Sequence, residues 1–190
     1  MYGMINRALE DMVLSYHGQE TWRTVLRKAN VDVEMFVRME TYPDSMTYSL
    51  VGAASEVLGK TVPDLLRDFG IFWVRYTGSE GYGPLLDEAG ENLTEVLSNL
   101  DEMHFRLGTI FPMYGAVKPG QGMQPPQFSC TDIDGKTLTL HYYSKRAGLA
   151  PMVMGLVEGL AERLKCAVEI QQLTFKDRGD DHDSFSVRYT

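Results

Sequence analysis

The sequence predicts an α+β fold, in which a helical N-terminal part (1–111) is followed by a sheet-containing part (127–190) with the order ββαββ. Apolar residues recur at helical spacing through the first part and at strand spacing through much of the second. The segment between them, 113–126, is dense in Gly and Pro and is typical of a loop. We expect a single domain over residues 1–190, because a chain of this length with 44% apolar residues can bury a substantial core.

The N-terminal part begins with three helices. The first carries an apolar stripe that includes Ile5, and Gly18 is expected to end it. A second helix follows directly. Asp44 or Ser45 is expected to cap the third, which ends at Gly59, the residue type most common after a helix.

Two more helices complete this part. Thr61 begins the fourth helix. The clearest helix begins at Asn92, whose side chain can cap while Glu95 completes a box-like arrangement. Its apolar positions follow helical spacing, which places His104 among leucines, and Pro112 is expected to end it.

The sheet-containing part opens with a hairpin. Segments 128–133 and 137–143 flank the turn pair Asp134-Gly135, a strong signal for two antiparallel strands. A helix through 152–164, with Pro151 near its start, and strands near 167–175 and 185–189 complete the ββαββ order. Residues 115–124 are expected to form a surface loop.

Charge and cysteine content exclude several classes of protein. The formal net charge of −8 argues against nucleic acid or an anionic membrane as a partner. Only Cys130 and Cys166 are present, in no metal-type spacing, which favours a reducing, cytoplasmic setting. No apolar run reaches the length of a membrane span, so we expect a soluble, unexported protein.

Two features suggest a site. Tyr142, Ser144 and Arg146 form Tyr-x-Ser-x-Arg, and alternate positions of an extended segment project to one face. A phenol, a hydroxyl and a guanidinium on one face suit carboxylates. With the imidazole of His104 on an apolar surface, they match what a dicarboxylate porphyrin with an axial iron ligand requires. Each feature alone has a plainer interpretation: a core histidine bonded to a carbonyl, or a strand end with a surface arginine.

Other polar clusters are given no role. His17 and His141 are expected to be exposed histidines without chemistry. The acidic segment 180–183 can in principle bind a hard cation, but its place between two strands favours a solvated hairpin loop.

The combination of His104 with Tyr-x-Ser-x-Arg resembles the H-NOX (haem nitric oxide/oxygen binding) family, and the resemblance extends over nearly the whole chain. It implies a fold that encloses a haem pocket, with ferrous haem b as cofactor and His104 as its proximal ligand. By the same resemblance, Tyr142, Ser144 and Arg146 hold the propionates. Pro126 is similar to the family proline that presses on the porphyrin.

The resemblance also places the opposite side of the pocket. Ile5 lies on the N-terminal helix that packs against the other face of the ring. Oxygen-binding members carry a distal tyrosine, and the position that matches it here is Met152, which cannot donate a hydrogen bond. Trp73 matches the other distal position, and its indole N–H is a donor in principle. Oxygen is therefore expected to bind poorly.

The function that follows from the resemblance is a sensor of nitric oxide, also able to bind carbon monoxide, rather than an enzyme. Gas binding is expected to release the proximal histidine, and a histidine kinase or a cyclic dinucleotide enzyme is expected to read the change. Three alternatives remain open: a reversible oxygen carrier, a haem-free ligand or interaction module, and a haem enzyme, which would need a distal acid–base group.

Overall fold

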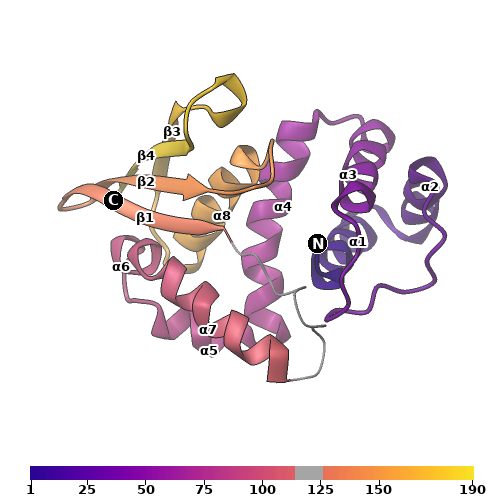
Figure 1. Ribbon diagram of the computed structural model, residues 1–190, viewed down its shortest axis with the longest axis horizontal. Coiled ribbons are helices and arrows are strands. Elements are labelled where there is room, and N and C mark those ends of the chain that lie inside the picture. Colours follow the sequence, from indigo (N-terminus) through magenta and orange to yellow (C-terminus); the bar gives the residue numbers. More distant parts are fainter. Residues whose placement is uncertain (114–125) are drawn as a thin grey trace.

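The computed structural model describes residues 1–113 and 126–190, and over 107–113 it describes the backbone alone. It confirms the α+β class: helices make up the N-terminal part, and a four-stranded antiparallel sheet forms the C-terminal part. In Figure 1, α1–α3 lie on one side of the molecule and the sheet lies on the other, with α4 passing between them. The loop expected over 115–124 lies outside the described residues.

The first four helices agree closely with the predicted ones. They are α1 (Gly3–His17), α2 (Gln19–Ala29), α3 (Asp44–Leu58) and α4 (Val62–Thr77). Gly18 and Gly59 follow α1 and α3 with φ of 81° and 65°, a conformation that glycine adopts without steric cost. Thr61 caps α4, because its hydroxyl accepts a hydrogen bond from Asp64 N. The expected cap at Asp44 or Ser45 is wrong: α3 begins at Asp44, and the cap position is held by Pro43, which makes no side-chain cap hydrogen bond.

The helix predicted from Asn92 is divided in two. Asn92 does cap it, accepting from Glu95 N at 3.0 Å, but α6 (Leu93–Ser98) ends at Asn99 and α7 (Leu100–Met113) follows. Asn99 leaves the helical conformation, and its side-chain amide donates to Ala89 O at 2.8 Å. Asparagine commonly offers such alternatives to helical hydrogen bonds. Two elements before α6 were not predicted, namely η1 (Gly78–Tyr82) and α5 (Gly83–Glu88).

The sheet has the strand order β1-β2-β4-β3. Its strands are β1 (Gln127–Asp134), β2 (Thr137–Tyr143), β3 (Val168–Thr174) and β4 (Asp183–Tyr189). A hairpin turn joins β1 to β2 as predicted, but one residue later: Asp134 pairs with Thr137, so the turn residues are Gly135, at a φ of 57°, and Lys136. Tyr142 pairs with Phe128 on one side and with Asp183 on the other. Helix α8 (Ala150–Arg163) connects the two hairpin pairs, and the short turn η2 (Lys176–Arg178) lies between β3 and β4.

Helices α4 and α8 pack against each other with their backbones nearly in contact. A Cβ atom at Gly155 of α8 would lie 1.9 Å from the Arg67 carbonyl oxygen, and one at Gly70 of α4 would lie 2.3 Å from the Met152 carbonyl oxygen. The buried apolar residues form two groups, one among α1–α4 and one between α5–α8 and the sheet. The division of the chain into 1–111 and 127–190 stays a prediction. None of the helices described is at once long and apolar enough to cross a membrane.

Candidate haem-binding cavity

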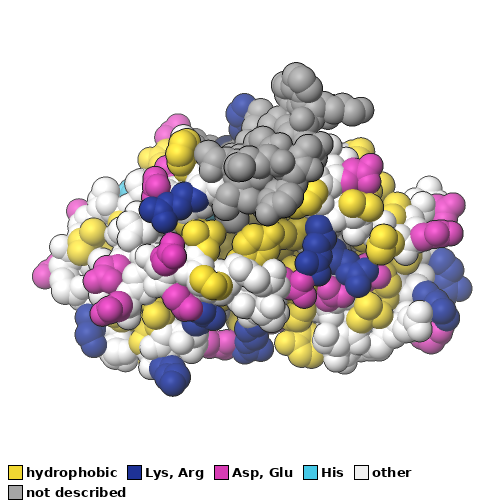
Figure 2. All heavy atoms as spheres, turned by 90° about the horizontal axis from the view of Figure 1, so that it is seen from below, with side chains coloured by type: hydrophobic (Ala, Val, Ile, Leu, Met, Phe, Trp, Pro, Cys, Tyr) yellow, Lys and Arg dark blue, Asp and Glu magenta, His cyan; other side chains and the backbone are white. Residues whose placement is uncertain are grey.

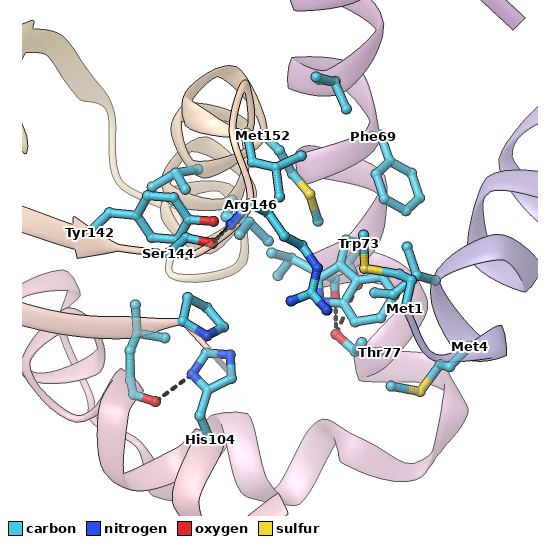
Figure 3. A pocket seen from close by; sticks show the side chains of 18 of the residues that line it. Met1, Met4, Phe69, Trp73, Thr77, His104, Tyr142, Ser144, Arg146 and Met152 are labelled. Atoms are coloured by element: carbon cyan, nitrogen blue, oxygen red, sulfur yellow. Dashed lines mark hydrogen bonds between the residues drawn. The ribbon is translucent and has the colours of Figure 1, made fainter. Parts of the chain in front are cut away.

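A cavity of about 700 Å³ lies between the two groups of buried residues. Its lining is largely apolar, and apolar side chains also gather in the middle of the face shown in Figure 2. All eight residues predicted to form the site line this cavity: Ile5, Trp73, His104, Pro126, Tyr142, Ser144, Arg146 and Met152. They come from five helices and strands and from the segments that flank the first two strands (Figure 3).

His104 lies on the first turns of α7 and forms one wall. Its Nδ1 is 2.7 Å from the carbonyl oxygen of Leu100, an acceptor only, so Nδ1 carries the hydrogen and Nε2 keeps its lone pair (Figure 3). Burial lowers the pKa of His104, although the Leu100 carbonyl and Asp101 act in the opposite direction. The ring stacks on Phe128, with 5.5 Å between centroids. A neutral imidazole with its other N–H on a carbonyl is the usual state of a metal ligand.

The Tyr-Ser-Arg residues meet at one edge of the cavity, but not for the predicted reason. Strand β2 ends at Tyr143, and residues 144–148 bend away instead of remaining extended. The hydrogen bonds that hold the bend include those from Arg146 N to Ser144 Oγ at 3.1 Å and from Tyr48 Oη to Ala147 O at 3.1 Å. Strand alternation therefore accounts for the position of Tyr142 only, whereas the bend brings Ser144 and Arg146 to the edge of the cavity.

Tyr142 is the buried member of this group, with 4% of its surface exposed. Burial raises the pKa of its phenol, while a hydrogen bond with Ser144 and the charge of Arg146 act against that rise. The phenol therefore stays protonated at neutral pH and can donate to an anion.

Arg146 is bound to a carboxylate that the sequence did not indicate. Its Nε lies 2.8 Å from Asp44 Oδ2, and its Nη2 lies 3.4 Å from Asp44 Oδ1. Burial acts to raise the pKa of Asp44, but hydrogen bonds from the Met1 amino group and from Arg146 outweigh it, and the pKa is lowered. The first residue of α3 is thus joined to the segment that follows β2, 102 positions later.

The wall opposite His104 is apolar, and several of its hydroxyl groups are already engaged. Trp73 and Met152 face the cavity from α4 and α8, near Phe69 (Figure 3). Thr77 Oγ1 donates to the Trp73 carbonyl at 2.8 Å, and Thr47 Oγ1 donates to the Asn6 side-chain oxygen at 2.7 Å. The Trp73 ring packs beside Phe69, with 6.1 Å between centroids, and its indole N–H is the donor that this side chain carries.

Two predictions about histidines and acidic residues need correction. His141 is not a free exposed residue: its Nδ1 lies 2.8 Å from His182 Nε2, and its Nε2 lies 2.8 Å from Thr131 Oγ1. Asp183, placed in a solvated loop, is 7% exposed and accepts from Gln172 Nε2 and from Lys176 N. The described part of the chain holds no cluster of three or more side chains suited to a metal ion.

The residues fit a porphyrin with two carboxylates. An apolar cavity of this volume is in the range of sites for small organic ligands, and its polar groups are few and convergent. Donors at one edge suit carboxylates, and a neutral imidazole with Nδ1 hydrogen-bonded and Nε2 unprotonated suits iron. Asp44 and Phe128 were not predicted as part of the site, because their roles depend on contacts between distant segments. Thr77 was not predicted either, although its hydrogen bonds lie within its own helix.

Comparison with known proteins identifies related sequences. A family model described as Haem-NO-binding matches residues 2–172. Soluble guanylate cyclase gcy-37 of Caenorhabditis elegans is 31% identical over 194 residues, which cover 98% of this chain and 26% of that protein. Soluble guanylate cyclase gcy-32 of the same organism is 30% identical over 165 residues, with 86% and 23% covered. The chain thus spans about a quarter of the length of these relatives.

Solved structures share the fold. The H-NOX protein from S. oneidensis in the Fe(II)NO ligation state superposes with a TM-score of 0.85 at 22% identity, and 100% of this chain and 99% of that chain are covered. The unliganded Fe(II) H-NOX protein from K. algicida gives 0.82 at 21% identity, with 100% and 97% covered. These matches confirm the predicted fold, and the family model confirms the predicted resemblance.

Proposed function

The chain belongs to the haem-NO-binding family, and from this premise we propose that it is a sensor of nitric oxide and carbon monoxide that excludes oxygen. As a member of this family it is a haem-binding gas-sensor domain. The finer proposal is that ferrous haem b is the cofactor, with His104 as its axial ligand. The chain matches the sensor part of the cyclases, so no catalytic activity is proposed for it.

One observation carries the proposal. The neutral imidazole of His104, whose Nδ1 is bonded to the Leu100 carbonyl, faces the same apolar cavity as Tyr142, Ser144 and Arg146. His104 would hold the iron, and the other three would hold the propionates. Pro126 and Ile5 would contact the ring. When bound, haem supplies a ferrous iron with one open position for a diatomic gas.

Selectivity against oxygen is assigned to the wall around Trp73 and Met152. A stable oxygen complex usually needs a hydrogen-bond donor beside the gas, whereas nitric oxide and carbon monoxide do not. Met152 has no donor, and the hydroxyls of Thr47 and Thr77 donate to protein oxygens. Trp73 carries a further donor at this wall, its indole N–H, and the oxygen measurement below tests whether it reaches bound oxygen.

The signal is proposed to leave through α7. Its described contacts to the sheet include the hydrogen bond from Phe128 N to Asp101 Oδ1 at 3.1 Å and the stacking of His104 on Phe128. Release of His104 from the iron would remove one restraint on this helix and shift a two-state equilibrium. Phe105, next in the chain, is 66% exposed and can report the shift to a partner, for which we propose a histidine kinase or a cyclic dinucleotide enzyme.

Absorption spectra test the proposal. The reduced protein is recorded without gas, with nitric oxide, with carbon monoxide and in air, alongside His104→Gly and the control His17→Gly at an exposed site. We expect nitric oxide and carbon monoxide to shift the Soret band and air to give no stable complex. His104→Gly should lose haem unless imidazole is supplied, while His17→Gly behaves as wild type. Absence of haem binding would refute the proposal, and a stable oxygen-bound spectrum in air would show that the protein is an oxygen carrier instead.

A further inference from the structure

The loop between β3 and β4, residues 175–182, is held by several contacts within itself and to β2. Phe175 N donates to Asp180 Oδ2 at 2.6 Å, and the Arg178 guanidinium lies 4.0 Å from the Phe175 ring centroid. At its far end His182 is bonded to His141 and stacked on Tyr143, with 4.2 Å between ring centroids. The loop is therefore fixed against the end of β2, where the Tyr-Ser-Arg segment begins.

Lys176 is the residue of this loop that reaches the segment. Its backbone N–H donates to the buried Asp183 carboxylate at 3.0 Å, which fixes the start of its side chain. Its ammonium group donates to the backbone carbonyl of Ser144. Ser144 and Arg146 line the cavity, so Lys176 supports the bend that carries them.

Charge gives a second reason to consider Lys176. Arg146, the cation within the Tyr-Ser-Arg group, is already bound to Asp44. Asp44 is also paired with the Met1 amino group, whereas Asp183, which pairs with Tyr142 in the sheet, brings a buried carboxylate near the same edge. A dicarboxylate at this edge would thus meet the fixed carboxylate of Asp183, and the ammonium of Lys176 is a described cation on the Ser144 side that offsets it.

We propose that Lys176 is a positioning residue for the carboxylate-binding edge of the cavity. It holds the Ser144 carbonyl, and so the bend that presents Ser144 and Arg146, and it adds positive charge behind that bend. This inference rests on the proposed function, in which the edge receives the propionates of haem.

The test compares haem loss from Lys176→Met and from Lys145→Met, each in the full chain. Lys145 is exposed in the same bend, so both variants lose one positive charge from the same region. Haem loss is followed by its transfer to an excess of an acceptor protein, at low and high potassium chloride. Thermal unfolding of each haem-free variant checks the fold.

We expect haem to leave Lys176→Met roughly 10-fold faster than wild type, the size of effect given by one charge-assisted hydrogen bond. Salt should speed loss from wild type and from Lys145→Met more than from Lys176→Met, because screening acts on a charge that the latter lacks. Lys176→Arg should restore most of the slow loss. A purely structural role would not reproduce this dependence on salt.

Equal rates of haem loss in Lys176→Met and Lys145→Met overturn the inference while leaving the proposed function in place. A wild-type protein that takes up no haem overturns both. Should Lys176→Met not fold, Lys176→Gln carries the same comparison, since it keeps a donor for the Ser144 carbonyl without the charge.

Discussion

At the scale of single residues, the protonation of His104 is set by its own helix and its apolar neighbours. The Leu100 carbonyl, four residues earlier, accepts a hydrogen bond from Nδ1 at 2.7 Å, and burial lowers the pKa of His104. Both effects come from helical geometry and apolar neighbours, which the spacing of residues predicted. Nε2, the nitrogen proposed to bind iron, thus keeps its lone pair because of local structure alone.

Met152 provides a prediction about oxygen. Met152→Tyr places a phenol at the wall opposite His104, where a donor can stabilise bound oxygen. We expect the variant to form an oxygen complex in air that persists long enough for a spectrum, while wild type forms none. Met154→Tyr is the control, because Met154 packs in the core beside the sheet and is absent from the cavity lining. An oxygen complex in the control variant would refute this assignment of the distal wall.

His141 provides a prediction about pH. Burial and the facing His182 lower its pKa, with Asp132 acting in the opposite direction. A depressed folded-state pKa means that the unfolded chain binds the proton first, so the free energy of unfolding falls as pH decreases below about 6.5. We expect the fall, measured by urea unfolding of the haem-free protein, to be shallower in His141→Gln. The control His17→Gln should keep the wild-type slope, and an unchanged slope in His141→Gln would contradict the account.

At the scale of elements, the contact between α4 and α8 sets the width of the molecule beside the cavity. Gly155→Ala would put a methyl group 1.9 Å from the Arg67 carbonyl oxygen, and backbone cannot yield without separating the helices. We expect a loss of about 1–3 kcal/mol in the free energy of unfolding of the haem-free protein. Gly52→Ala in α3, where no atom lies within 4 Å of the added Cβ, should be neutral or stabilising by up to ~1 kcal/mol. Equal effects at the two glycines would show that the close contact is unimportant.

Whether an element could be predicted from the sequence depends on whether its signals are local. Helix ends marked by Gly18, Gly59 and Thr61 agree with the structure because their signals act within one turn. The break at Asn99 was missed, since its side chain bonds to Ala89, a partner set by tertiary packing. The turn η1 has no periodic apolar pattern, and its conformation depends on Gly81 at a φ of 95°.

The predicted site shows the same limit. Tyr142 could be placed by strand alternation, but Ser144 and Arg146 reach the cavity through a bend. Asp44 and Lys176 bind that bend from positions 102 residues before Arg146 and 32 residues after Ser144. Such partners have no local signature, so residues that line the cavity could be predicted, while the contacts that support the bend could not.

At the scale of the whole molecule, the cavity divides the buried residues into two groups. One group belongs to α1–α4 and the other to the sheet with α5–α8, and both contribute to the lining. The described links between them include the Asp44–Arg146 pair and the close contact of α4 with α8. A ligand that fills the cavity therefore contacts both groups and should stabilise them together.

Haem loading provides the last prediction. At free haem about 100 times its dissociation constant, the gain is ~2.7 kcal/mol, which corresponds to roughly 5–10 °C in the unfolding midpoint for a chain of this size. Hydrogen exchange should slow both in α1 and α3 and in β2 and α8, because the ligand touches residues from both groups. A metal-free porphyrin keeps the carboxylates but offers no iron to His104, so its shift should be smaller. Protection confined to one side would mean that the cavity does not couple the two groups, whatever the size of the thermal shift.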